Sequence, residues 1–216
     1  MAQTYVIPTR MELTRLKKKL VTARRGHKLL KDKRDELMRQ FLELVHNNRA
    51  LREQVEEKIR RANKDFVLAK AAMSEEELHV ALMCPKQEIQ LSVSSQNIMS
   101  VEVPVFEASM RTSDPNDIYS YGLAFTSADL DDAVKDLADI LPAMLRLAET
   151  EKSCQLLADE IEETRRRVNA LEHVTIPQTQ EMIRSISMKL DENERSSQTR
   201  LMKVKDMMLA EAHHYT

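Results

Sequence analysis

Apolar residues recur along the first third of the chain at alternating intervals of three and four. The series consists of Leu13, Leu16, Leu20, Ala23, His27, Leu30, Arg34, Leu37, Phe41, Leu44, Asn48, Leu51 and Val55. One interval of four then leads to Ile59, and the series continues to Met73. This spacing is typical of a coiled-coil seam, and an inserted interval of four shifts a supercoil without ending it. It predicts a helix from about Thr9 to Met73, roughly 100 Å long at 1.5 Å per residue.

A capping box predicts where this helix begins. Thr9 stands three residues before Glu12, so the two side chains can satisfy the first free amides. Pro8 disfavours helix before that point.

A second helical stripe occupies residues 127–213, and Ser127 can cap its start. Its apolar positions are Leu130, Val134, Leu137, Leu141, Met144, Leu145, Leu157, Ile161, Val168, Leu171, Met182, Ile183, Ile186, Leu190, Leu201, Val204 and Met208. Pro142 predicts a kink or break, and Pro177 predicts a bend, because proline removes a helical hydrogen bond.

Folding the two helical stretches back on each other predicts an antiparallel coiled coil. The simplest register places Thr9 beside Leu209, and residues 48–51 beside residues 168–171. In that register Asn48 and Asn169 could meet in the seam and fix the alignment.

The middle of the chain changes to a period of two. Alternation at Ile89, Leu91 and Val93, and again at Val101, Val103 and Val105, predicts a β-hairpin within residues 88–106. The intervening residues 94–97 are turn-like.

Composition supports a mainly α fold with little globular core. Of 216 residues only two are Gly, none is Trp, 4% are aromatic and 31% are charged. We therefore expect a single elongated unit: a coiled-coil helix (9–73), a head containing the hairpin (74–126) and a kinked helical region (127–213).

Charge is polarised along the chain although the net charge is only −2. Residues 10–39 carry twelve Lys or Arg and four Asp or Glu, an excess of eight positive charges. This excess makes the first half of the N-terminal helix a candidate surface for an acidic partner.

Catalytic and cofactor chemistry finds no support in the motifs. The only glycines are Gly26 and Gly122, which excludes a Walker-type phosphate loop. Cys84 and Cys154 lie far apart, and the six histidines form no metal-ligand spacing. We expect no catalytic residue, no cofactor, no metal and no segment inserted in a membrane. Gly26 is unusual inside a strong helix, where it costs about 1 kcal/mol relative to Ala.

Two segments of the chain resemble a known family of proteins. These segments are PTRMELTRLKKKLVTARRGHKLLKDKRDELMRQF (8–41) and TRRRVNALEHVTIPQTQEMIRSISMKLDENERSSQTRLMKVK (164–205). They resemble the D subunit of V-type and A-type ATPases, with bacterial sequences closest. The resemblance implies the central rotor axle of a rotary motor that couples ATP hydrolysis or synthesis to Na⁺ or H⁺ transport.

The resemblance also implies partners and a place in the cell. These are a hexamer of catalytic A and non-catalytic B subunits, the small F subunit of the stalk, and a funnel-shaped C or d subunit above a membrane ring, on the cytoplasmic side. The expected contacts with acidic loops of the hexamer are Lys17, Lys18, Arg24, Arg25, Lys28, Lys31, Arg165, Arg166 and Arg167. The hairpin would modulate hydrolysis.

Two other classes of protein share some of these features. A prefoldin-like chaperone also pairs its terminal helices around hairpin segments, although such proteins are usually much shorter. A nucleic-acid binder would use the basic stretch, but aromatic residues do not interleave with the charges and acidic residues interrupt the face.

Overall fold

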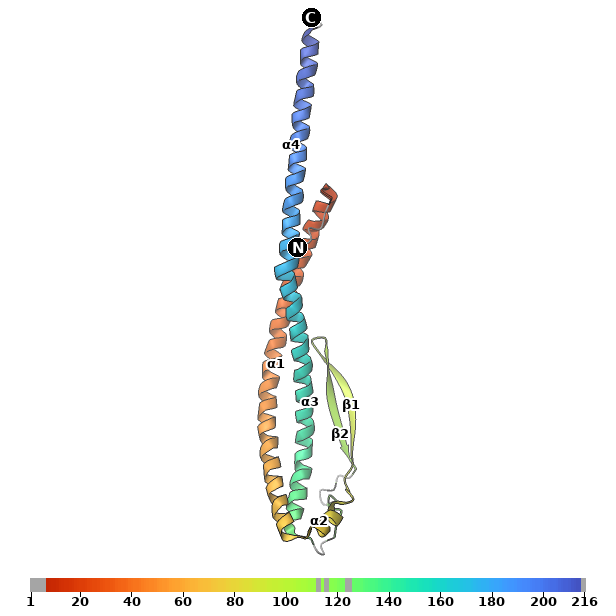
Figure 1. The fold of residues 1–216 in the computed structure, drawn as a ribbon. Helices are drawn as coiled ribbons and strands as arrows, with labels where there is room; N and C mark the ends of the chain where they lie inside the picture. Colours follow the sequence, from red (N-terminus) through yellow and green to blue (C-terminus); the bar gives the residue numbers. More distant parts are fainter. Residues whose placement is uncertain (1–6, 112–113, 115–116, 123–125, 215–216) are drawn as a thin grey trace. The chain divides into compact units, whose positions relative to one another are not determined.

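The computed structural model describes residues 7–111, 114, 117–122 and 126–214, with side chains described as far as Leu209. Figure 1 shows its helices and the hairpin. The chain divides into two units, which are described separately. The terminal unit comprises residues 1–35 and 163–216, and the central unit comprises residues 36–162. The prediction of one elongated unit stays a prediction.

Helix α1 (Arg10–Ala72) follows the predicted seam closely. All the predicted seam positions from Leu13 to Met73 are buried or half-buried. The inserted interval is confirmed as well, because Val55 and Ala62 are buried and Ile59 between them is half-buried. At the start, the Glu12 N–H donates to Thr9 Oγ1 over 3.2 Å, as expected of an N-cap.

The second helical region consists of α3 (Ala128–Ala170), a π turn η1 (Leu171–Thr175) and α4 (Ile176–His214). Ser127 caps α3, since its Oγ accepts from the Asp129 N–H at 3.2 Å. The helix runs through Pro142 without a break, so the break predicted there is wrong, while the alternative of a kink stays a prediction. The irregularity near Pro177 is the π turn that precedes it.

The terminal unit contains an antiparallel helix pair whose register differs from the predicted one. Arg10 forms an ion pair with Glu194, and His27 Nε2 lies 3.2 Å from Glu172 Oε2. Residues near position 170 therefore face the region around His27, and the predicted alignment with residues 48–51 is wrong. The prediction assumed two stripes that end together, whereas α4 continues past the start of α1.

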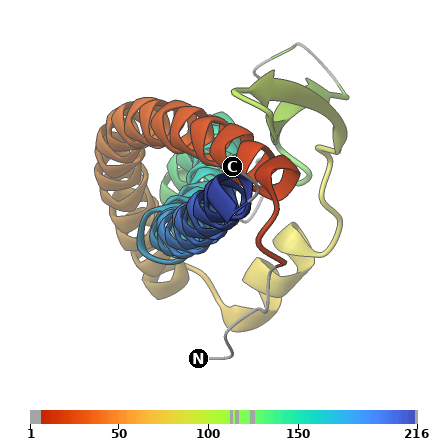
Figure 2. The ribbon, with the colours of Figure 1, turned by 90° about the horizontal axis from the view of Figure 1, so that it is seen from above.

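The central unit contains the helix pair formed by the rest of α1 and α3. Arg61 Nε lies 3.3 Å from Asp136 Oδ2, and Arg52 Nη1 lies 3.8 Å from Glu151 Oε1. Ascending positions on α1 therefore match descending positions on α3, which confirms antiparallel packing. Seen along the helices, the hairpin and the short α2 (Glu75–Leu82) lie on the same side of this pair (Figure 2).

The hairpin is present, but its turn is not where the sequence placed it. Strands β1 (Ile89–Ile98) and β2 (Val101–Met110) pair antiparallel with Ile98 opposite Val101. Residues 94–97, predicted as the turn, lie within β1. The turn is Met99–Ser100, with φ values of 51° and 74°. Met99 packs against a buried cluster to which both the hairpin and the helices contribute, and its partial burial offsets a backbone conformation that favours glycine.

The core of the central unit forms where the hairpin meets the helices. Val101 and Val103 share a buried cluster with Leu37 of α1 and with Leu157 and Ile161 of α3. A second cluster joins α1 to α2 and to the start of α3, through Ala69, Leu78, Ala81 and Leu130. The hairpin is thus anchored by the half of β2 nearest the turn.

Candidate interaction surfaces

A basic face on α1 is the main candidate surface of the terminal unit. Lys17, Arg24, Lys28 and Lys31 are separated by seven, four and three residues, which places them on one face of a helix. They are exposed and form no ion pair with any described residue. We call these four residues the basic face. Cations left without internal partners are available to an acidic surface of another protein.

Lys18 and Arg25 are also exposed and without an ion pair among the described residues, on the neighbouring face of the helix. Exposed Val21 lies between them and the basic face, so the surface is not purely ionic. The sequence pattern therefore predicted the cations of this surface but not the apolar residue among them.

The three predicted arginines near the end of α3 differ from one another. Arg165 is exposed and has no ion pair with the residues that the structure describes. Arg167 pairs with Glu163 one turn away, and Arg166 also has an interaction within the chain. An ion pair within one helix contributes about 0.3–0.5 kcal/mol, so it leaves the cation largely free to exchange partners.

Helix α4 carries an exposed apolar surface beyond Glu194. The sequence pattern had predicted part of the coiled-coil seam there. Six large apolar residues there are 51–69% exposed: Leu201, Met202, Val204, Met207, Met208 and Leu209. Arg10, the first residue of α1, pairs with Glu194. Helix α1 therefore does not extend along the part of α4 that carries these six residues. Met202 and Met207 lie off the predicted stripe and widen it, and a large exposed apolar patch is typical of a surface that another protein covers.

The six predicted hairpin residues have different environments. Val101 and Val103 are buried, Val105 and Ile89 are half-buried, and Leu91 and Val93 are 44% and 63% exposed. The hairpin therefore has an anchored end and an exposed apolar stretch.

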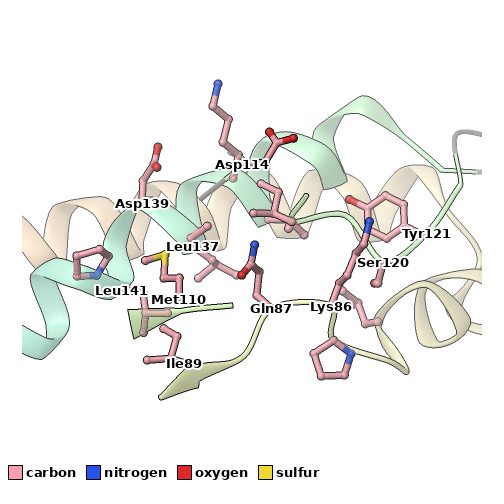
Figure 3. A pocket seen from close by; sticks show the side chains of 17 residues that line it. Lys86, Gln87, Ile89, Met110, Asp114, Ser120, Tyr121, Leu137, Asp139 and Leu141 are labelled. Atoms are coloured by element: carbon pink, nitrogen blue, oxygen red, sulfur yellow. The ribbon is translucent and has the colours of Figure 1, made fainter. Parts of the chain in front are cut away.

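A cavity of about 670 Å³ lies between the base of the hairpin and α3 (Figure 3). Ile89, Met110, Leu137 and Leu141 form its apolar wall, and the Gln87 side chain extends into it. Gln87 Nε2 donates to the Asp117 carbonyl at 3.1 Å. This hydrogen bond engages one polar group of the lining with the chain itself.

Tyr121, at the edge of this cavity, has a strongly shifted pKa. Burial, and then its hydrogen bond to Asp131 at 2.8 Å, raise the pKa of the Tyr121 phenol far above its usual range. A phenol held neutral in this way fixes the loop to α3 rather than acting as a base.

The described residues provide neither a metal site nor a membrane-spanning helix. No group of three or more His, Cys, Asp or Glu side chains in that part of the chain could hold a metal ion. None of the helices described there has a stretch long and apolar enough to cross a bilayer.

Comparison with known proteins gives a consistent result over nearly the whole chain. The family model of the ATP synthase D subunit matches residues 12–206. The V-type ATP synthase D subunit of Acetivibrio thermocellus is 65% identical over 215 residues, covering 100% of this chain and 97% of that protein. The V-type ATP synthase D subunits of Clostridioides difficile and Clostridium novyi are 60% and 61% identical, over 98% and 96% of this chain and 95% and 97% of their own lengths.

These matches extend through the hairpin and the head, beyond the two segments (8–41 and 164–205) whose sequence resembles the family. They favour a component of an ATPase over the chaperone and nucleic-acid alternatives, and over an enzyme complete in itself. With its antiparallel helix pairs and its hairpin, the chain belongs to the family of ATP synthase D subunits.

Proposed function

We propose that this protein is the central-stalk rotor shaft of a V-type ATP synthase. It couples ATP hydrolysis or synthesis in a surrounding hexamer to the transport of Na⁺ or H⁺ through a membrane ring. Membership of the D-subunit family supports this proposal, and the basic face of α1 is the observation on which it rests most directly.

The basic face gives a physical basis for rotation. Four cations that form no ion pair with the described residues lie on one side of α1, and Lys18 and Arg25 extend this charge onto the neighbouring face, so the positive charge is unevenly distributed around the helix. If acidic loops of the hexamer close in turn, each closure attracts that side, and the preferred angle of the shaft changes with the nucleotide state. Lys18, Arg25, Arg165, Arg166 and Arg167 complete the proposed contact set.

The remaining partners follow from the same proposal. The terminal unit enters the hexamer of A and B subunits, where the exposed apolar end of α4 is covered. The central unit binds the small F subunit and the funnel-shaped C or d subunit, on the cytoplasmic side of the membrane and without insertion. The exposed residues Leu91 and Val93 make the hairpin the candidate for modulation of ATP turnover.

Charge reversal tests the basic face. Arg24→Glu with Lys28→Glu should weaken association with the catalytic subunits by roughly tenfold or more and lower ATP-driven rotation, because attraction becomes repulsion. Lys58→Glu with Lys64→Glu is the matched control, since both lysines are exposed on α1 in the central unit. Equal effects of the two pairs on association with the hexamer and on rotation would contradict the proposal.

The regulatory part of the hairpin needs a separate test. Residues 89–105 are replaced by a short linker, and ATP turnover of the reconstituted complex is measured. Unchanged turnover would remove modulation from the proposed role and leave the shaft itself untouched.

A further inference from the structure

The regular helical backbone of the terminal unit is interrupted at η1. The Ile176 N–H donates to the Leu171 carbonyl, one residue further along than in an α-helix. Pro177 follows immediately and has no N–H, so position 177 can donate no backbone hydrogen bond. The segment from Leu171 to Pro177 therefore lacks the uniform bonding of the helices on either side.

Side-chain packing is also weak in this segment. None of the five residues of η1 is buried, and Val174 is 49% exposed. The buried Thr179 hydroxyl donates back to the Thr175 carbonyl at 2.6 Å, a bond that often bends helices. Few buried apolar contacts and irregular hydrogen bonds are the features of locally opening structure.

The partner helix has its own weak position at the same level. Gly26 lies within α1, where glycine is about 1 kcal/mol less favourable than alanine. A Cβ at Gly26 would meet no atom within 4 Å, so packing within the chain does not require glycine there. The next residue, His27, contacts Glu172 of η1 at 3.2 Å. The weak position of α1 and the π turn thus lie at the same level of the helix pair.

We propose that Gly26 and residues 171–177 form one compliant joint, at which the helix pair of the terminal unit bends or twists. Two paired helices yield easily only where both are weak at the same level, because one stiff helix would hold the other straight. The His27–Glu172 contact keeps the two weak points aligned. The joint follows from local backbone structure and does not depend on the proposed function.

Amide hydrogen exchange on the full chain tests the coupling between the helices. Gly26→Ala should slow exchange in residues 22–30 by ~5-fold, the factor that corresponds to about 1 kcal/mol of helix propensity. It should also slow exchange in residues 171–176 on the other helix. Asn47→Ala is the control: Asn47 is exposed on α1 in the central unit, and its replacement should leave residues 171–176 unchanged.

Distance measurements between spin labels test the bending itself. The labels are placed at Arg165→Cys and Ser185→Cys, two exposed positions on either side of η1, with Cys84→Ser and Cys154→Ala to remove the native thiols. A control pair at Glu43→Cys and Asn63→Cys has the same separation along uninterrupted α1. The first pair should give the broader distance distribution, and Gly26→Ala and Pro177→Ala should each narrow it.

Three results would each overturn the proposed joint. Equal widths for the two label pairs would overturn it, as would a distribution that Gly26→Ala leaves unchanged while circular dichroism shows full helicity. Slower exchange confined to α1 would show that Gly26 acts alone, and this would also overturn a joint shared by both helices.

Discussion

Val103 of β2 and Leu157 of α3 lie in one buried cluster, with exposed fractions of 3% and 0%. The hairpin therefore contributes to the core of the central unit and is held there by apolar contact with the helices. We expect Leu157→Ala to lower the free energy of unfolding by about 2–5 kcal/mol, measured by urea denaturation. Leu201→Ala, at a residue 69% exposed, should change it by less than ~0.5 kcal/mol.

A double-mutant cycle checks the contact between these two side chains. Because they share one cluster, the losses from Val103→Ala and Leu157→Ala should not add. Strict additivity would show that the hairpin end is not packed on α3 in solution.

The hairpin turn yields a prediction with opposite signs at neighbouring residues. Ser100 has φ of 74° and an exposed side chain, so Ser100→Gly should raise the unfolding midpoint, with a gain of about 0.5–1 kcal/mol. Met99 has φ of 51° but packs against the cluster, so Met99→Gly loses burial and should give no such gain. Stabilisation by both changes would contradict the anchoring role of Met99.

The cap of α2 predicts a dependence of stability on pH. The Ser74 backbone N–H, then its hydroxyl, lower the pKa of Glu77 from 4.5. A lowered pKa means that this stabilisation is fully present above 4.5 and is lost as the pH falls through the folded-state pKa. Glu77→Gln should flatten the acid limb of the thermal-stability profile. Glu76→Gln, in the same exposed turn, is the control and should leave that limb in place.

The two cysteines should differ in their reactivity toward alkylating agents. Burial, and then Glu151, raise the pKa of the Cys154 thiol, which lowers its thiolate fraction, whereas Cys84 is exposed. Iodoacetamide at pH 7–8 should therefore modify Cys84 first, as followed by peptide mass spectrometry. Faster modification of Cys154 would mean that α3 is more open in solution than in the structure.

Sequence alone predicted the features that follow from local spacing. The seam of α1, its slip after Val55 and the caps at Thr9 and Ser127 depend only on nearby residues and were confirmed. The turn was misplaced because Ser94–Asn97 has turn propensity, whereas Met99 packs against a cluster built from distant parts of the chain, and this packing favours a turn at Met99–Ser100. Helix α2 was not predicted, because its eight residues are too few for an apolar period to stand out within the segment 74–126, for which the sequence predicted only the hairpin.

The register of the helix pair and the partners of the cations depend on residues far away in the sequence or on other proteins. An apolar stripe has the same appearance whether the same chain or another protein covers it, so Leu201 and Val204 were placed in the seam. Likewise, the charge count identified the basic stretch, but only the structure separates Lys17 and Arg24, which form no ion pair with the described residues, from Arg167, which pairs with Glu163.

The buried apolar seam of each helix pair and the exposed cations of α1 differ in their sensitivity to ionic strength. Apolar burial is not screened by salt, and exposed ion pairs between the helices contribute at most about 1 kcal/mol each. Attraction between the basic face and an acidic surface, in contrast, is largely screened at 1 M salt, where the Debye length is ~3 Å. Concentrated salt should therefore release this protein from acidic partners while leaving it folded.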